Sequence, residues 1–125
     1  ERALRFSLQG PGPAFAMIAG FEGPASRIIF GTARLRETPA PFEVLDAAWG
    51  AGVNCFDLAR SYGDGESERI FGEWLSSRAI PRRSVRLITK GGAGSQATQW
   101  AATLDEAVLE AELKASLAAL GVPYV

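Results

Sequence analysis

Residues 52–90 decide the fold, and they read GVNCFDLARSYGDGESERIFGEWLSSRAIPRRSVRLITK. The pattern predicts a short strand ending at Asp57, a loop carrying Tyr62, a helix, and a second strand ending at Lys90. Parallel strands joined by a crossover helix place their C-terminal ends side by side. We therefore expect a carboxylate, a phenol and an amine to meet at one edge of a sheet.

These three residue types together make a proton donor. A free phenol has a pKa of about 10, so it gives up its proton reluctantly near neutral pH. A nearby ammonium favours the phenolate, and a carboxylate can keep that ammonium charged and oriented. On this hypothesis Tyr62 donates the proton, Lys90 makes the phenol a stronger acid and Asp57 holds Lys90 in place. The alternative is that all three are ordinary polar residues of strand ends and loops.

The same stretch resembles the aldo-keto reductase family. The family motif is a glycine, a small hydrophobic residue, Phe-Asp-Thr-Ala, two further residues, Tyr-Gly and a helix that opens with Glu. Here the run is Gly52-Val53-Asn54-Cys55-Phe56-Asp57-Leu58-Ala59-Arg60-Ser61-Tyr62-Gly63, followed by Glu66 to Leu75. Ile88-Thr89-Lys90-Gly91-Gly92 resembles the family's third strand, and Ser116 to Val125 resembles its approach to the fourth. The resemblance covers about Ile28 to Val125 and fixes residues in order and spacing.

The resemblance implies an α/β fold, the N-terminal portion of a (β/α)8 TIM barrel. We expect about three βα units preceded by a hairpin, with residues 1–27 forming the extended or hairpin region. Residues 28–125 would form βα units 1 to 3 and the start of strand 4. Such barrels have about 250 residues, so 1–125 is expected to be an incomplete barrel domain. Alone, this portion is expected to be inactive, and its open sheet edge would make it aggregation-prone or only partly folded.

The resemblance also implies an NADP-dependent oxidoreductase that interconverts a carbonyl (aldehyde, ketone or sugar) and an alcohol by hydride transfer. Tyr62, Asp57 and Lys90 would be catalytic, with Tyr62 as general acid/base. Gly31, Thr32 and Asp57 would contact NADP(H), and the substrate would be a small molecule. The alternatives are an NADP-binding regulatory or catalytically degenerate member, an inactive fragment, or an unrelated α/β domain whose motif residues are coincidental.

The chain departs from the family pattern at three places. Leu58 replaces the usual Thr beside the acid, and Ala33 stands where a bulkier residue is common. The family's fourth catalytic residue is a histidine, and this chain contains none. Because the family places that histidine at the end of the fourth strand, we expect it about six residues beyond Val125.

Composition excludes several classes of function. A net charge of −1 gives no electrostatic footprint for nucleic acid, and no apolar run is long enough to span a membrane. Without histidine, neither a Ser-His-Asp triad nor a His-ligated zinc site is possible within these residues, and no metal site is expected. Cys55 is the only cysteine, so no disulfide forms within the chain, which fits a cytoplasmic protein.

The elements before the motif are less sharply defined. Leu4 to Leu8 and Ala14 to Ile18 are predicted as extended pieces separated by a Gly-Pro turn at 10–13. Ile28 to Thr32 is predicted as the first barrel strand, buried on both faces. A helix is expected to open after Thr38, with an apolar face made by Val44, Leu45, Ala48 and Trp49.

The last part of the chain is predicted as a loop and a helix. The glycine-rich segment after Lys90 leads through Trp100, which either lines the substrate mouth or packs within the loop. Thr103 and Glu106 form an expected capping box for the third helix. A stripe of Leu109, Leu113, Leu117 and Leu120 would face the sheet, and Gly121 would end the helix.

Overall fold

A computed structural model describes residues 15–94 and 101–125, so the expected piece Leu4 to Leu8 and the expected role of Trp100 lie outside the described residues. Within them, a parallel sheet has the order β3-β4-β5, formed by Ile29–Gly31, Cys55–Asp57 and Arg86–Ile88. Its register aligns Gly31 with Asp57 and Asp57 with Ile88. The predicted pairing of consecutive parallel strands is confirmed.

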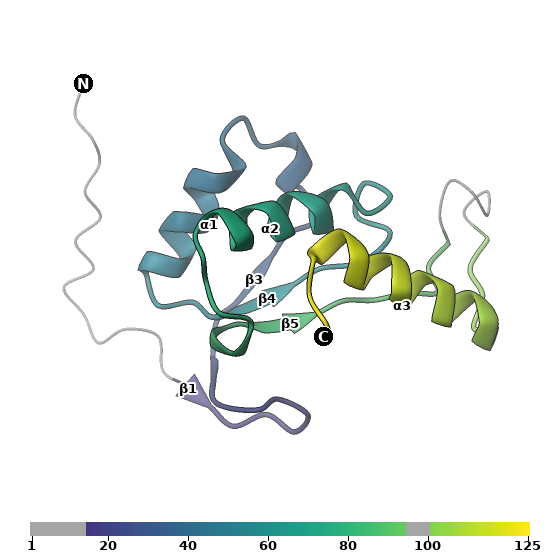
Figure 1. Cartoon of the computed structure of the whole chain (residues 1–125), viewed down its shortest axis with the longest axis horizontal. Helices are drawn as coiled ribbons and strands as arrows, with labels where there is room; N and C mark the ends of the chain where they lie inside the picture. Colours follow the sequence, from purple (N-terminus) through teal and green to yellow (C-terminus); the bar gives the residue numbers. More distant parts are fainter. Residues whose placement is uncertain (1–14, 95–100) are drawn as a thin grey trace.

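Helices connect these strands and cover one face of the sheet. Helix α1 (Pro41–Gly50) follows β3 and the short 3-10 turn η1 (Leu35–Glu37), while α2 (Glu66–Ser77) follows β4. A second 3-10 turn, η2 (Arg82–Ser84), precedes β5, and α3 (Glu106–Leu120) follows it. Figure 1 shows α1 and α2 side by side above the strands, with α3 beside α2. This is the expected succession of three βα units.

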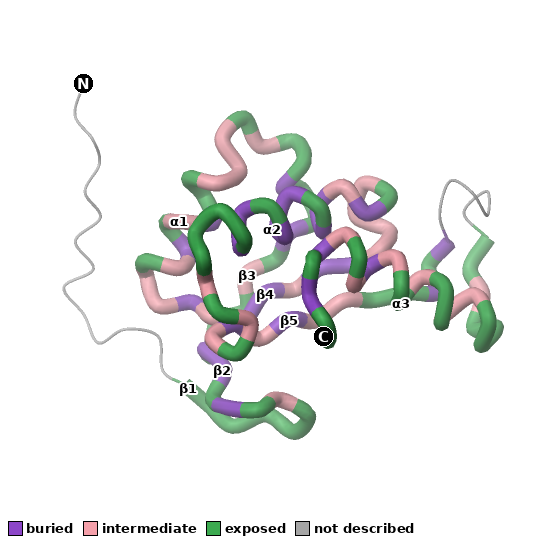
Figure 2. Tube along the Cα trace, viewed as in Figure 1, coloured by how far each residue is buried: buried purple, intermediate pink, exposed green. Residues whose placement is uncertain are grey.

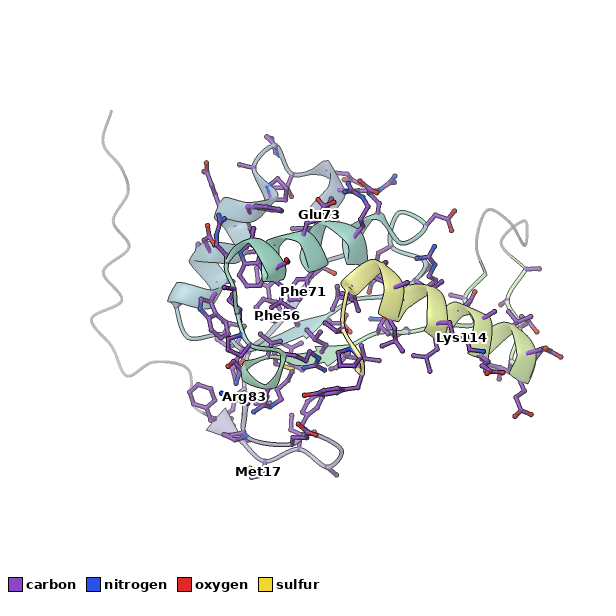
Figure 3. The ribbon with its side chains drawn as sticks, viewed as in Figure 1. Met17, Phe56, Phe71, Glu73, Arg83 and Lys114 are labelled. Carbon is purple, nitrogen blue, oxygen red and sulfur yellow. The ribbon has the colours of Figure 1, made fainter. Side chains whose placement is uncertain are left out.

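An aromatic cluster joins the sheet to α2. Phe56, at the centre of β4, has its ring centroid 4.9 Å from that of Phe71, 5.9 Å from Trp74 and 6.1 Å from Phe30. Phe56, Phe71 and Trp74 are fully buried, and Figure 3 shows the first two between α2 and the sheet. Burying each ring contributes about 1.5–3 kcal/mol. Figure 2 shows the buried residues gathered in this layer. Trp49, predicted on the apolar face of α1, packs against Trp74 of this cluster, with ring centroids 6.5 Å apart.

An N-terminal hairpin lies within the region predicted to be extended or hairpin. Strand β1 (Phe15–Ala16), inside the predicted extended piece Ala14 to Ile18, pairs antiparallel with β2 (Ala25–Ser26), which the sequence analysis did not identify as a strand. The hydroxyl of Ser26 accepts hydrogen bonds from the amides of Asn54 and Cys55, at 3.1 and 3.2 Å. The hairpin thus attaches to the start of β4, below the sheet in Figure 1.

The first barrel strand is not buried on both faces, so that prediction is wrong. Ile29 is 45% exposed, whereas Phe30, on the other face of β3, packs against the core. Side chains alternate between the faces of a strand, and the described helices cover only the Phe30 face. A run of β-branched residues predicts a strand but does not say how many of its faces are covered.

The N-cap of α3 also differs from the expected capping box. Asp105 is the N-cap, and its Oδ1 accepts from the amides of Ala107 and Val108 at 3.1 and 3.2 Å. The hydroxyl of Thr103 instead accepts from the Asp105 amide at 3.1 Å. Of the predicted stripe, Leu113 is 45% exposed, while Leu120 is 1% exposed. The C-terminal half of α3 therefore supplies its packing.

Helices α2 and α3 meet at Gly72, where a side chain has no room. A Cβ atom there would lie 2.6 Å from the Leu120 carbonyl oxygen and 2.7 Å from that of Ala119. Both neighbours are backbone, so they cannot turn aside. Gly72 is therefore the residue that permits this close approach.

We predict that Gly72→Ala destabilises the full-length protein by about 1–3 kcal/mol, because the methyl group forces the two helices apart. Gly50→Ala is the matched control, since a Cβ at Gly50 meets nothing within 4 Å. That control is expected to stabilise by about 0.4–1 kcal/mol. Urea unfolding of both variants measures this, and equal effects of the same sign would contradict the account.

Hydrogen bonds to Asp46 connect α1 to α2, and their contribution to stability depends on pH. Asp46 accepts from Arg78 at 2.7 and 2.9 Å and from the Trp74 indole at 2.8 Å. The hydrogen bonds from Arg78 and then Trp74 lower the pKa of Asp46 from 3.8 to about 2. Because the folded-state pKa is depressed, this stabilisation is present above pH 3.8 and is lost as pH falls toward 2.

We therefore predict that the melting-temperature difference between the native protein and Asp46→Asn is largest near neutral pH and shrinks below about pH 4. Thermal unfolding of both proteins across this range gives the measurement. A difference that stays constant down to the lowest pH at which both fold would show that the Asp46 charge is not involved.

Candidate active site

The parallel register brings Asp57 and Lys90 to the same edge of the sheet. Asp57 ends β4, and Lys90 follows β5 by two residues. Backbone bonds continue the pairing past the strands, from the Leu58 amide to the Ile88 carbonyl at 2.8 Å and from the Arg60 amide to the Lys90 carbonyl at 2.9 Å. This edge is the C-terminal one, where (β/α)8 barrels carry their active sites.

The three predicted side chains lie together. The Lys90 ammonium donates to Oδ1 of Asp57 at 2.6 Å, which confirms the expected ion pair. The Tyr62 hydroxyl lies 3.5 Å from Oδ2 of the same carboxylate. The Lys90 nitrogen also lies over the Tyr62 ring, 4.8 Å from its centroid. One carboxylate thus contacts both the amine and the phenol, whereas the sequence predicted that Asp57 contacts Lys90 and that the Tyr62 hydroxyl lies close to the Lys90 amine.

The environment of Lys90 favours its charged form. Partial burial lowers the pKa of Lys90, but hydrogen bonds with Asp57 and Tyr62 outweigh that effect and raise it above 10.5. The Lys90 side chain is 44% exposed and that of Asp57 33% exposed, so solvent reaches the pair. The site therefore holds a cation beside a phenol on an accessible edge.

Gly31 and Thr32, the residues expected to contact the cofactor, lie next to Asp57. A Cβ at Gly31 would meet nothing within 4 Å, so this residue leaves open space beside its register partner Asp57. Thr32 is 1% exposed, and both its amide and its hydroxyl donate to the Asp57 carbonyl, at 3.1 and 3.0 Å. Thr32 therefore fixes the backbone of Asp57.

A buried carboxylate that the sequence reasoning missed lies behind this edge. Glu68, in the first turn of α2, is 0% exposed, and it contacts Arg60 at 3.2 Å and the Thr89 hydroxyl at 2.7 Å. A sequence signal existed, because Glu68 precedes Phe71 by three residues and Leu75 by seven, on the apolar face of the helix. A charged residue on that face is a candidate for a buried contact.

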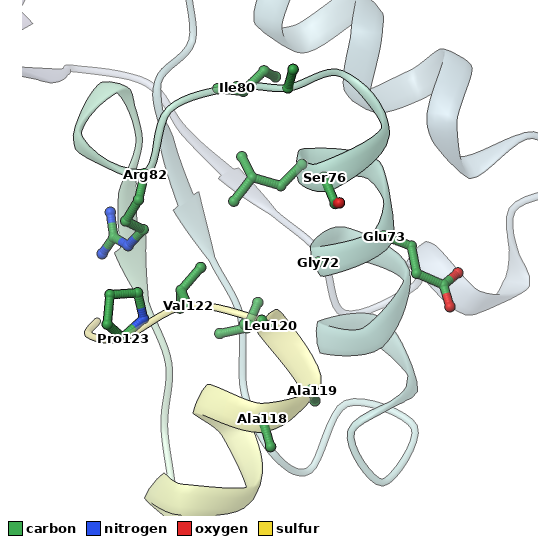
Figure 4. Close-up of a pocket in the computed structure, with 13 residues that line it drawn as sticks. Gly72, Glu73, Ser76, Ile80, Arg82, Ala118, Ala119, Leu120, Val122 and Pro123 are labelled. Carbon is green, nitrogen blue, oxygen red and sulfur yellow. The ribbon is translucent and has the colours of Figure 1, made fainter.

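A groove of about 620 Å³ lies elsewhere, between the C-terminal ends of α2 and α3 (Figure 4). Residues such as Gly72, Ile80, Leu120 and Val122 line it, and Asp57, Tyr62 and Lys90 do not. Few polar groups converge there, which is unlike the small-molecule sites of enzymes. We therefore take the strand-end cluster, and not this groove, as the candidate active site.

Comparison with known proteins agrees with this geometry. The sequence model of the aldo/keto reductase family matches residues 27–125. The chain belongs to that family. An aldo-keto reductase of Metarhizium robertsii is 51% identical over 47 residues, which are 38% of this chain and 13% of that protein. A Schizosaccharomyces pombe protein provisionally named voltage-gated potassium channel subunit beta is 35% identical over 83 residues, which are 65% of this chain and 24% of that protein.

Solved structures of the family share the fold. An aldo-keto reductase of Bacillus halodurans in its holo form has a TM-score of 0.78 and 24% identity, over 90% of this chain and 38% of that one. A glycerol dehydrogenase of Gluconobacter oxydans has a TM-score of 0.70 and 28% identity, over 86% of this chain and 36% of that one. The fold class, the N-terminal portion of a (β/α)8 barrel, is confirmed. The division at residue 27 stays a prediction.

The chain therefore spans less than half of these aldo/keto reductases. Within residues 15–94 and 101–125, no helix combines the length and the apolar character needed to cross a bilayer.

We predict that Asp57→Asn in the full-length protein lowers the pKa of Lys90. The substitution removes the acceptor charge that raises this pKa, while the opposing effect of burial remains. NMR titration of protein isotope-labelled at its lysine side chains measures the change, with Lys90→Arg to assign the signal. Asp64→Asn is the control, because Asp64 is exposed on the loop after Tyr62. An unchanged Lys90 titration in Asp57→Asn would contradict the ion pair.

Proposed function

We propose that this chain carries the proton-donating part of an NADP-dependent oxidoreductase that interconverts a carbonyl and an alcohol. The observation that supports it is the Asp57 carboxylate lying between the Lys90 ammonium and the Tyr62 hydroxyl, at 2.6 and 3.5 Å. An acid, a phenol and an amine at the C-terminal edge of a parallel sheet suit general acid/base chemistry.

In the proposed reaction the nicotinamide, when bound, supplies the hydride to the carbonyl carbon. The carbonyl oxygen takes the proton of the Tyr62 hydroxyl, so that carbonyl, hydride and proton together give the alcohol. The negative charge left on the Tyr62 oxygen is stabilised by Lys90, whose ammonium is oriented by Asp57. Alcohol oxidation runs through the same groups in reverse. The 3.5 Å contact of Tyr62 is long, as hydrogen bonds of active sites often are without substrate.

The cofactor edge in this proposal consists of Gly31, Thr32 and Asp57. The open space beside Gly31 fits a planar ring at the strand ends, since a larger residue there would fill it. Thr32 would act through the backbone of Asp57, which its hydroxyl holds at 3.0 Å. NADP(H) is the cofactor that the family resemblance implies.

The substrate we infer is a small aldehyde, ketone or sugar, or the matching alcohol. Two relatives support this class by name: the Gluconobacter oxydans glycerol dehydrogenase and a Saccharomyces cerevisiae protein provisionally named aryl-alcohol dehydrogenase. The latter is 49% identical over 49 residues, 39% of this chain and 13% of that protein. We also propose a cytoplasmic location, because Cys55 is a free and buried thiol.

A regulatory NADP-binding subunit is the second candidate. The Schizosaccharomyces pombe relative with a channel-subunit name favours it. Steady NADPH consumption with an aromatic aldehyde separates the two proposals. The enzyme turns over continuously, whereas the regulatory subunit binds NADPH with little consumption.

We predict that Tyr62→Phe lowers carbonyl reduction by the full-length protein by about two orders of magnitude or more, with NADPH binding retained. The substitution keeps the aromatic ring and removes only the hydroxyl. Tyr124→Phe is the matched control, because the hydroxyl of Tyr124, the chain's other tyrosine, contacts Glu22 at the hairpin and not the strand-end cluster. Equal losses of binding and turnover in Tyr62→Phe would mark Tyr62 as a structural residue.

A further inference from the structure

We propose that Glu68 is a positioning residue that sets the distance between Lys90 and the loop bearing Tyr62. The inference rests on the proposed function, because positioning matters for turnover only if Tyr62 and Lys90 act on a substrate. Its structural part, however, concerns contacts within this chain and is testable without turnover.

Glu68 connects three elements of the site with one carboxylate. It belongs to α2, its Oε2 lies 3.2 Å from the Arg60 guanidinium, and its Oε1 accepts from the Thr89 hydroxyl at 2.7 Å. Arg60 precedes Tyr62 by two residues in the loop after β4, and Thr89 immediately precedes Lys90. The two sides of the active site are therefore held to the same carboxylate.

The burial of Glu68 requires a reason. Its side chain is 0% exposed and that of Arg60 is 23% exposed. Removing a carboxylate from water costs several kcal/mol, and an apolar residue of similar volume often stabilises a protein equally well. General stability alone therefore does not call for a charge at this place. A carboxylate is favoured here because its two oxygens can accept from two donors at once, which fixes the loop after β4 relative to the end of β5.

Successive side chains of a strand point to opposite faces, so the contact of Glu68 with Thr89 also affects how Lys90 is oriented. Leu87 is buried on the helix-covered face, and Thr89, two residues later, turns the same way to reach Glu68 of α2. Lys90 then points to the opposite side, where it meets Asp57. Holding the Thr89 hydroxyl therefore fixes the direction in which the Lys90 side chain leaves the backbone.

The tyrosine loop is fixed at the same time. The Arg60 amide donates to the Lys90 carbonyl at 2.9 Å, while the Arg60 side chain pairs with Glu68. The amide of Ser67, the neighbour of Glu68, donates to the Tyr62 carbonyl at 3.3 Å. The first turn of α2 thus holds both the loop that carries Tyr62 and the strand end that carries Lys90.

Thr89→Val tests this link with the smallest change, since it keeps the branched shape and removes the hydroxyl that Glu68 binds. In the full-length protein we expect kcat to fall about tenfold or more, with KM and the NADPH dissociation constant changed less than about twofold. The lysine NMR titration is expected to show a lower Lys90 pKa, because its contact with Asp57 loosens. Thr89→Ser, which restores a hydroxyl, is expected to recover both values.

A second pair of variants uses the carboxylate itself. Glu68→Gln is expected to shift the Lys90 titration in the same direction as Thr89→Val, whereas Glu73→Gln is not. Glu73 lies on the same helix, but its side chain is 55% exposed and pairs with Arg69 (Figure 3). If Glu68→Gln does not fold, the two Thr89 variants still decide the question.

The outcomes separate this inference from the proposed function. A native Lys90 titration in Thr89→Val overturns the positioning role, whatever the activity. A shifted titration that Thr89→Ser reverses supports the role even if the native protein reduces no carbonyl, in which case the oxidoreductase proposal fails by itself. A loss of thermal stability with unchanged Lys90 titration and kcat would make Glu68 a structural residue only.

Discussion

The parallel register between β4 and β5 decides where Asp57 and Lys90 of the candidate site lie. Because Asp57 is aligned with Ile88, the backbone bonds that follow the strands bring Lys90 beside the Asp57 carboxylate. A shift by one residue would turn Lys90 toward the helices and leave Asp57 without its cation. The aromatic layer of Phe56, Phe71 and Trp74 stabilises this register, since its rings lock β4 against α2 on the opposite face. Core packing and site chemistry thus depend on the same pair of strands.

The site was predictable because its residues stand at fixed points of a simple topology. Asp57 and Lys90 follow apolar runs that the sequence identifies as strands, and parallel strands place such ends together. The expected ion pair is present at 2.6 Å. The sequence did not show that Asp57 would also contact Tyr62, because that contact depends on the path of the loop from Leu58 to Gly65. That path uses left-handed backbone at Gly63, Asp64 and Gly65, which residue type permits but does not dictate.

The features that the sequence did not predict depend on tertiary contacts or on competing local choices. The position of Glu68 on the apolar face of α2 indicates a buried contact, but its partners Arg60 and Thr89 come from other elements whose placement the sequence does not give. Thr103 and Asp105 are both good N-cap residues, and Asp105 is the one whose side chain accepts from the first-turn amides of α3. The hairpin strands are two residues long, so their pairing depends on Ser26 and Asn54 more than on strand propensity.

The central claim is that Asp57, Lys90 and Tyr62 act as one unit. A double-mutant cycle on NADPH-dependent carbonyl reduction by the full-length protein tests it most directly, with Asp57→Asn, Lys90→Met and the double variant compared with the native protein. If Asp57 acts by holding Lys90, the double variant loses about as much activity as Lys90→Met alone. Losses in kcat that multiply, as for two independent residues, would contradict the account.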